Sequence, residues 1–234
     1  MKPFTTPLKW MALAFVFSMI VSGCSSVSPT VSLGDASCRI PCWYGLAPGK
    51  TTFDEALSVV KSLRFVSSDS LKTDSSTPGQ EPYIYWLFAN ELAGQGVVFF
   101  DTHKRIQEIR LNTRGLTLGS VIDAFGSPKT IWANITPVVD NFDFGPHYNL
   151  GLYFPQGIYI EIADKAKGDL KTVTQDITRD LNVDSIYLFA PTDLETFLGQ
   201  ITESPSNQAR LDYIRARLQP WPGFGKDVVH VTWP

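Results

Sequence analysis

The stretch Thr52-Phe53-Asp54-Glu55-Ala56-Leu57 opens the segment, 52–63, that decides the fold. Thr52 and Glu55 have the spacing of a capping box, in which each side chain accepts a hydrogen bond from the backbone N–H of the other residue. Apolar side chains then recur on one helical face, at Phe53, Ala56, Leu57, Val60 and Leu63. The segment therefore predicts an amphipathic helix.

The same plan returns at Thr117-Leu118-Gly119-Ser120. The apolar face of this second segment is made by Leu118, Val121, Ile122 and Phe125. Gly126 and Pro128 follow it, and residues of these two types end helices. We therefore expect a second short helix, preceded by a glycine-bearing turn at 114–116.

Strand-like segments follow each predicted helix. They lie at 83–89, 96–101 and 105–112 after the first helix, and at 130–134, 150–154, 157–162 and 185–189 after the second. Residues 102–104 and 155–157 predict hairpin turns, and the polar stretch 67–82 predicts a long loop. A helix followed by an antiparallel meander, twice over, predicts an α+β fold rather than a parallel βαβ one.

The repeated plan also predicts how the chain is divided. Residues 38–113 form a first α+β unit and residues 114–190 a second. Residues 191–234 form a C-terminal helical and aromatic extension packed on the second unit. In this extension one helix begins at Thr192 or Asp193, another covers 206–218, and 228–233 make a last strand.

The N-terminus has the pattern of an export signal. Lys2 and Lys9 precede an apolar run at 10–21, which is shorter than the roughly 20 residues that span a bilayer. Val21-Ser22-Gly23-Cys24 ends this run and resembles the lipobox of bacterial lipoproteins. The resemblance implies that 1–23 are removed and that Cys24 is lipidated, with palmitate among its acyl chains. It further implies that Ser25 directs the protein to the outer membrane of a cell that has one. An uncleaved anchor and an ordinary secretory signal are the alternatives.

Lipidation of Cys24 leaves two cysteines, Cys38 and Cys42. An exported compartment permits disulfides, and the ends of so short a loop can meet, so we expect a Cys38–Cys42 disulfide. A metal half-site and two free thiols are the other readings. The Ser-rich stretch 24–37 between the anchor and this loop predicts a flexible tether.

The helical openings also resemble a known family. Two stretches are similar to the helical opening of the SmpA/OmlA outer-membrane assembly lipoproteins. The first contains Gly49, Thr51-Thr52 and Glu55-Ala56, and the second contains Gly115, Thr117, Val121, Phe125-Gly126 and Pro128. Those proteins share a helix-plus-meander unit with β-lactamase inhibitor protein, in which the unit occurs in tandem. The strands at 97–101 and 105–109 are similar to that unit's final hairpin. The resemblance implies two such units and a protein partner. Residues 62–65 depart from the pattern, because the family closes its helix there with a Leu-Gly-x-Pro sequence.

We find no catalytic motif in the sequence, and no cofactor or metal is expected. Without Lys2 and Lys9 the chain carries 18 basic and 23 acidic residues, a formal charge of −5, so nucleic acid is not an expected partner. Asp140 and Asp143 suggest an acidic surface loop rather than a calcium site.

Aromatic residues supply the remaining functional signal. In relatives such as β-lactamase inhibitor protein, the aromatic-bearing sheet face binds a protein partner. The candidate partner-binding residues here are Tyr85, Tyr153, Tyr159, Trp43 and Tyr44. We therefore predict a non-catalytic, extracytoplasmic lipoprotein that binds another envelope protein. An envelope hydrolase and a solute-binding lipoprotein are the alternatives.

Overall fold

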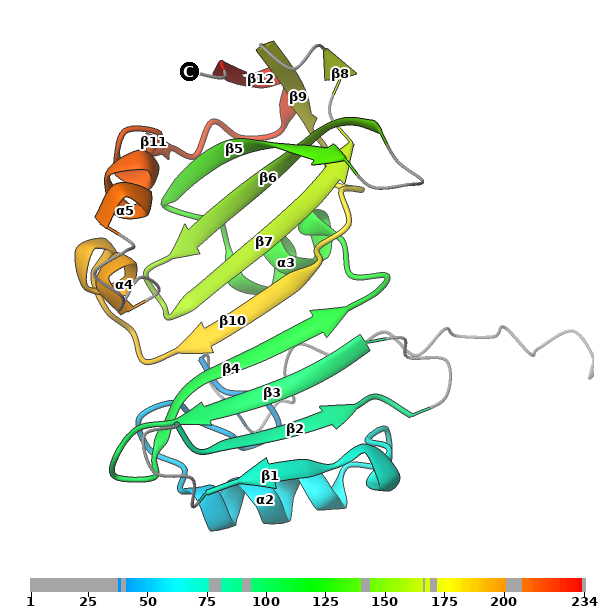
Figure 1. Ribbon diagram of the computed structural model, residues 1–234, viewed down its shortest axis with the longest axis vertical. Helices are drawn as coiled ribbons and strands as arrows, with labels where there is room; N and C mark the ends of the chain where they lie inside the picture. The colour runs from blue at the N-terminus through cyan, green and yellow to red at the C-terminus, as the bar shows by residue number, and fades with distance from the viewer. Residues whose placement is uncertain are drawn as a thin grey trace, which may run out of the picture. The chain divides into compact units, whose positions relative to one another are not determined.

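A nine-stranded antiparallel sheet organises the computed structural model of the chain, which describes residues 38, 41–75, 81–89, 94–139, 144–165, 167–168, 172–200 and 208–232. The strand order is β1-β2-β3-β4-β10-β7-β6-β5-β11, and a three-stranded sheet has the order β12-β9-β8. Figure 1 shows both sheets together with the helices. The expected α+β class is confirmed. The predicted signal, Cys24 and the tether lie outside the described residues.

The strands of the large sheet are β1 Lys72–Asp74, β2 Tyr83–Leu87, β3 Gly94–Phe100, β4 Ile106–Thr113, β5 Thr130–Val139, β6 Phe144–Phe154, β7 Ile158–Lys165, β10 Ser185–Phe189 and β11 Gln219–Pro220. Those of the small sheet are β8 Lys167–Gly168, β9 Thr172–Ile177 and β12 Gly225–Thr232. The helices are α2 Phe53–Ser62, the 3₁₀ turn η1 Ser68–Ser70, α3 Leu118–Phe125, α4 Leu194–Gln200 and α5 Gln208–Arg215. Within these described ranges, no helix has both the length and the apolar character needed to cross a bilayer.

Both predicted helix starts are confirmed. The Thr52 backbone N–H donates to Glu55 Oε2 at 2.8 Å at the start of α2. In α3 the Ser120 N–H donates to Thr117 Oγ1 at 3.3 Å, so a serine replaces the usual acid of the capping box. Gly126 ends α3 with a positive φ of 80°, a conformation that favours glycine.

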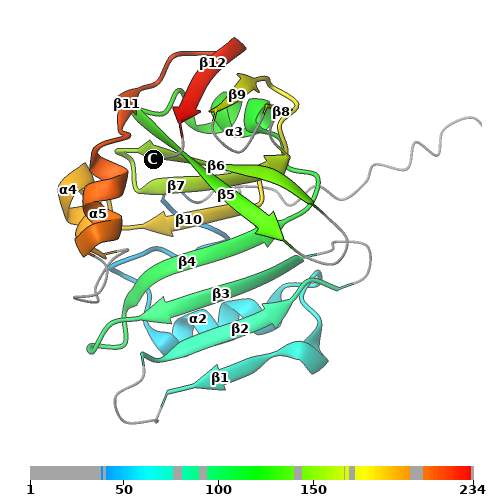
Figure 2. The same cartoon turned by 45° about the horizontal axis from the view of Figure 1, so that its top comes forward.

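α2 and α3 lie on the same side of the large sheet, behind it in Figure 1 and again in Figure 2. Alternate residues of the strands face these helices and form the main core. Residues 43–53 complete this layer. Trp43 stacks on Trp86 with ring centroids 5.7 Å apart, and the Gly49 N–H donates to the Ile106 carbonyl at 2.6 Å. Residues 43–53 therefore form part of the main core.

A second, smaller core occupies the other side of the sheet. α4 and α5 supply Phe197, Leu198 and Ile214, which pack on side chains from β5, β6, β7 and β10. We call this set the covered cluster: Trp132, Tyr153, Tyr159, Phe189, Phe197, Leu198 and Ile214. The C-terminal helices therefore cover only part of the second sheet face.

Several segments differ from the sequence-based expectation. The stretch 67–82 is not all loop, because it contains η1 and the edge strand β1. The Ser70 hydroxyl explains this placement, because it accepts a hydrogen bond from the Leu87 N–H at 2.8 Å and ties η1 to β2. Strands β5 and β6 run longer than expected, through paired prolines at Pro137 and Pro146. Strands β8, β9 and β11 were not expected.

Candidate functional site

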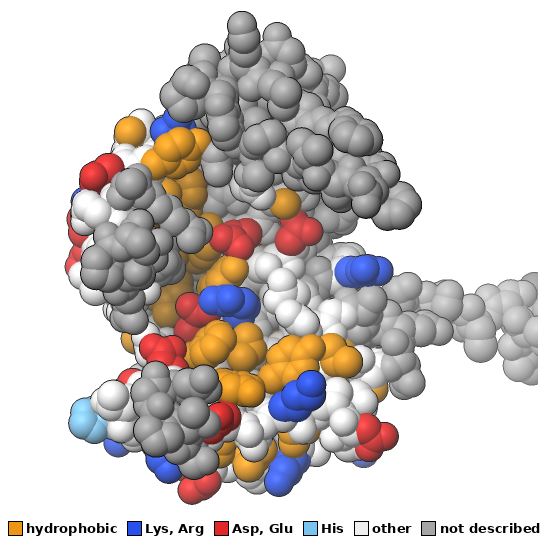
Figure 3. All heavy atoms as spheres, in the orientation of Figure 1, with side chains coloured by type: hydrophobic (Ala, Val, Ile, Leu, Met, Phe, Trp, Pro, Cys, Tyr) orange, Lys and Arg blue, Asp and Glu red, His pale blue; other side chains and the backbone are white. Residues whose placement is uncertain are grey.

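The sheet face opposite α2 and α3 has a part that α4 and α5 leave uncovered. Its side chains alternate along each strand with residues of the main core, and all of them are half-buried or exposed. We call this the open face: Tyr83, Tyr85, Leu87, Gln95, Val97, Phe99, Glu108, Arg110, Asn112, Glu161 and Tyr187. Figure 3 shows this side of the molecule, with hydrophobic side chains gathered over the β2–β4 region and charged ones among them.

Strand register places the central residues of the open face in one row. Tyr85 pairs with Val97, which pairs with Arg110, and Arg110 pairs with Tyr187 across the contact between β4 and β10. The row continues beyond Tyr187 to Tyr159. It therefore runs from the uncovered half of the face into the covered cluster.

Arg110 lies at the middle of this row and is held on three sides. Its Nε and Nη2 donate to Glu108 Oε1 at 3.1 and 2.9 Å. Its guanidinium carbon lies 5.4 Å from the ring centre of Phe99 and 4.7 Å from that of Tyr187. Cation–π contacts and a carboxylate thus fix this charge in place while 39 % of the side chain stays exposed.

Glu161 lies at the border between the open face and the covered cluster. Tyr187 Oη donates to its Oε2 at 2.6 Å and Tyr159 Oη donates to its Oε1 at 2.9 Å. Both oxygens of the carboxylate therefore accept a phenolic hydrogen bond. On the far side, the Tyr159 ring stacks on Trp132 with centroids 4.9 Å apart and planes 9° apart.

Burial changes the acid–base behaviour of two groups on this face. Desolvation raises the pKa of Glu108, although the neighbouring Arg110 opposes the shift. Desolvation and the negative charge of Glu161 raise the pKa of the Tyr187 hydroxyl above its ordinary value. Tyr187 therefore stays protonated at neutral pH and keeps donating to Glu161.

Two tyrosines expected on an exposed face are buried. Tyr153 is 1 % and Tyr159 4 % exposed, because Phe197 of α4 packs on both rings, with centroids 5.4 and 5.2 Å away. The Tyr153 hydroxyl also donates to the Thr192 carbonyl just before α4. Neither side chain therefore lies on the exposed sheet face where we expected it, since the C-terminal helices cover both.

The other expected residues are distributed differently. Trp43 is fully buried in the main core. Tyr44 lies on the same side of the sheet, with its ring centroid 5.1 Å from that of Phe65. Neither residue therefore belongs to the open face. Tyr85 does belong to it. The Tyr85 hydroxyl donates to Gln95 Oε1 at 3.1 Å, and Lys72 Nζ lies 6.0 Å from its ring centre. Cys38 and Cys42 lie at disulfide distance, with Cα atoms 5.5 Å apart.

The sequence reasoning missed the charged residues Glu108, Arg110 and Glu161. A usable signal was present for Arg110 and Glu161, because each stands between two apolar residues of an alternating strand and therefore faces away from the main core. Glu108 follows Gln107, so the alternation does not mark it. The pairing of β4 with β10 could not be read from that alternation, and this pairing is what brings Arg110 to Tyr187.

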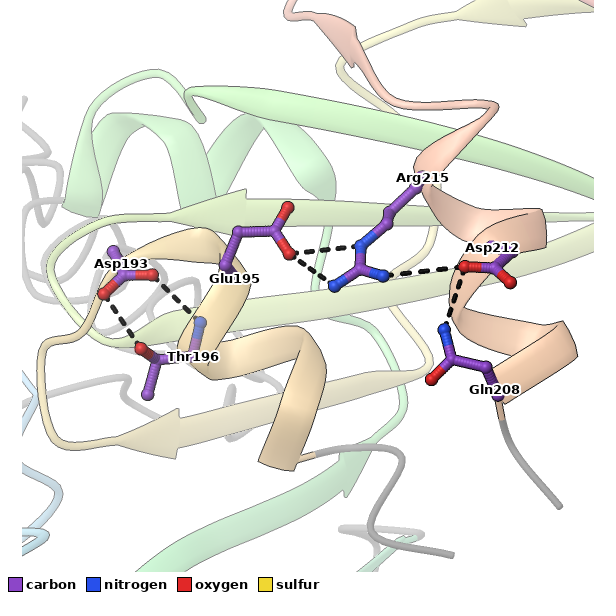
Figure 4. A network of polar contacts seen from close by, with 6 residues as sticks. All are labelled: Asp193, Glu195, Thr196, Gln208, Asp212 and Arg215. Atoms are coloured by element: carbon purple, nitrogen blue, oxygen red, sulfur yellow. Dashed lines mark hydrogen bonds and ion pairs between the residues drawn. The ribbon is translucent and has the colours of Figure 1, made fainter. Parts of the chain in front are cut away.

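A polar network links α4 and α5 to each other (Figure 4). Asp193 accepts hydrogen bonds from the Thr196 N–H and hydroxyl, both at 2.9 Å, and so caps α4. Arg215 of α5 donates to Glu195 of α4 through Nη2 at 2.6 Å and Nε at 3.1 Å. These groups are exposed, so the network positions the helices with little energy of its own.

Among the described residues, no group of three or more His, Cys, Asp or Glu side chains is arranged to hold a metal ion. Comparison of the chain with protein-family models, with curated protein sequences and with solved structures found no significant match.

Proposed function

We propose that this chain is a lipid-anchored, extracytoplasmic binding protein that holds another envelope protein on its open face. The observation that carries the proposal is the combination of half-exposed aromatic and apolar side chains with a rigidly held arginine. Tyr85, Val97, Phe99 and Tyr187 supply the contact area around Arg110. Fully buried contacts of aromatic and arginine side chains carry most of the energy of protein–protein interfaces.

The anchoring part of the proposal rests on the sequence. The lipobox at 21–24 and the Ser-rich 24–37 favour a diacylated Cys24 joined to the folded part by a tether. Such an anchor keeps the protein at the membrane, on the outer membrane where the cell has one, and leaves the open face available to envelope proteins.

We also propose that the fold consists of two duplicated helix-plus-meander units, similar to those of the SmpA/OmlA and β-lactamase inhibitor proteins. Support comes from the order of elements: α2 precedes β2–β4, and α3 precedes β5–β7 and β10. The last strands of the two series, β4 and β10, pair with each other. A duplication of this kind accounts for one sheet with two similarly capped helices on the same side.

Binding is favoured over hydrolysis by the state of the two acids on the open face. Glu108 bonds to Arg110, and both oxygens of Glu161 accept tyrosine hydroxyls. A general base or nucleophile needs an oxygen that is free to reach a substrate. Both oxygens of Glu161 are engaged, and one oxygen of Glu108 binds the Arg110 guanidinium, so these carboxylates hold neighbouring side chains in position.

Site-specific photocrosslinking tests the proposal in cells that make the full chain. A benzophenone amino acid replaces Val97 or Tyr85 on the open face, and Lys61, exposed on α2, is the control position. We expect protein adducts from 97 and 85 but not from 61, and a second substitution, Phe99→Asp, should remove them. Equal adducts from position 61, or adducts unaffected by Phe99→Asp, contradict the proposal.

A further inference from the structure

The charges on the open face are compensated unequally. Arg110 is paired with Glu108 through two hydrogen bonds to the same oxygen. The donors that the described residues offer to the Glu161 carboxylate are neutral, the hydroxyls of Tyr159 and Tyr187. No lysine or arginine in the described part of the chain forms an ion pair with Glu161. Within the described part of the face, Glu161 is therefore a half-buried negative charge without an ion-pair partner.

Partial burial removes some of the water from the Glu161 carboxylate. Removing a carboxylate from water is unfavourable unless an opposite charge or several hydrogen bonds replace the lost hydration. Two phenolic donors replace part of it and fix the direction of the carboxylate. A cation arriving from outside would supply the rest, and aromatic rings next to the carboxylate are surfaces on which a cation and its methylene stem bind well.

We propose that the partner presents a lysine or arginine side chain to Glu161. The inference rests on the proposed binding function and specifies the chemistry of the partner at one point of the open face. The predicted mature chain is acidic as a whole, with a formal charge of −5, so long-range attraction also favours a basic partner.

Arg110 is a weaker point of recognition than Glu161, although its opposite charge invites an acidic partner. Two of its nitrogens already bond to Glu108, and Phe99 and Tyr187 lie near its guanidinium. An incoming carboxylate must compete with Glu108 for the same cation and is repelled by it. At Glu161 an incoming cation meets no such competitor among the side chains that the structure describes.

A peptide library tests the inference without a known partner. Displayed random dodecapeptides are selected on the full lipidated chain in nanodiscs, and those weakened by Val97→Asn are kept as open-face binders. In these binders each arginine is replaced by citrulline, and each lysine by acetyl-lysine, which removes the charge. Each peptide is then titrated against the wild type, Glu161→Gln and Asp54→Asn, a control acid exposed on α2.

We expect one basic residue whose neutralisation weakens binding at least tenfold. Glu161→Gln should cause the same loss, and the two changes together should cost no more than either alone, since they remove one interaction. Asp54→Asn should change nothing. Glu161→Asp keeps the charge and should restore part of the affinity, and the melting temperature of each variant checks that it is folded.

The two levels of proposal fail in different ways. If open-face binders keep their affinity both when their basic residues are neutralised and when Glu161 is replaced by glutamine, the partner does not present a basic group to Glu161. The binding function is then left intact. A selection in which no peptide is weakened by Val97→Asn overturns the binding function itself. Binders that carry an acidic residue whose neutralisation matters, and that depend on Arg110, also refute the basic partner.

Discussion

Gly151 is the position where a single methyl group should disturb the candidate site. It lies on β6, in register with Trp132 of β5 and Glu161 of β7, and the indole of Trp132 lies over it. A Cβ atom on residue 151 would stand 2.5 Å from Trp132 Cζ2 and 2.7 Å from the Tyr159 hydroxyl. Gly151→Ala must therefore move the ring that stacks on Tyr159 and the hydroxyl that donates to Glu161.

The cost follows from these distances. Carbon atoms in good contact lie about 3.5–4.0 Å apart, so the Trp132 ring has to retreat by about 1 Å. The ring is only 6 % exposed, and Tyr159 packs against it, so the movement spreads into the covered cluster. Overpacking of this kind costs about 1–3 kcal/mol, and the replacement of glycine by alanine in a strand returns about 0.5–1 kcal/mol. The midpoints of these two ranges give an expected net loss of about 1 kcal/mol.

Urea unfolding of the wild type and Gly151→Ala measures this loss, and the near-ultraviolet circular dichroism reports the Trp132–Tyr159 stack. Gly199→Ala is the matched control, because no atom lies within 4 Å of a Cβ built at that exposed position of α4. The control should lose no stability. If Gly151→Ala is as stable as the control and has an unchanged aromatic spectrum, the packing argument is wrong.

Three further outcomes are expected. Phe197→Ala should lower the free energy of unfolding in urea by about 3–5 kcal/mol, because this ring is 2 % exposed and packs on three other rings, those of Tyr153, Tyr159 and Phe189. The control Phe224→Ala, at a 38 % exposed position, should cost far less. Because burial raises the pKa of Glu108, the native state holds that proton more tightly than the unfolded chain does. The stability that this tighter proton binding gives the native state is complete below the ordinary pKa of 4.5 and is lost as the pH rises through the raised pKa. Glu108→Gln should remove this part of the pH dependence of unfolding. A pH profile of the variant that is parallel to that of the wild type contradicts the assignment. Cys24→Ser should abolish labelling by palmitate and release the protein from the membrane fraction, and continued membrane attachment would rule out the lipid anchor.

Local signals in the sequence predicted the two capped helices and most strands. The capping boxes at Thr52 and Thr117 act within four residues, so a short window contains all the information needed. Strand β10, Ser185–Phe189, was predicted to its ends because its apolar run begins after the polar Asp184 and Ser185 and is stopped by Pro191. The 67–82 stretch was misread because the bonds that order it reach β2 and have no local pattern.

The site was harder to predict than the fold. Alternation on β6 and β7 correctly indicates that Tyr153 and Tyr159 face away from α2 and α3, but it cannot tell what covers them. The cover comes from Phe197 and Ile214, which follow in a different segment and pack by tertiary contact alone. Arg110 was overlooked for a similar reason, since its partner Tyr187 is brought to it only by the pairing of β4 with β10.

The pairing of β4 with β10 also bears on how the chain reaches its native state. Asn112 and Ser185, which hydrogen bond across this contact, are 73 residues apart in sequence. Contacts of such long range form slowly, because closing a long loop costs entropy before the pairing repays it. Until they form, the first half of the sheet has an unpaired edge at β4. A newly made chain therefore exposes a strand that β10 of a neighbouring copy can complete, so a domain-swapped dimer is the misfolded form that this topology most favours.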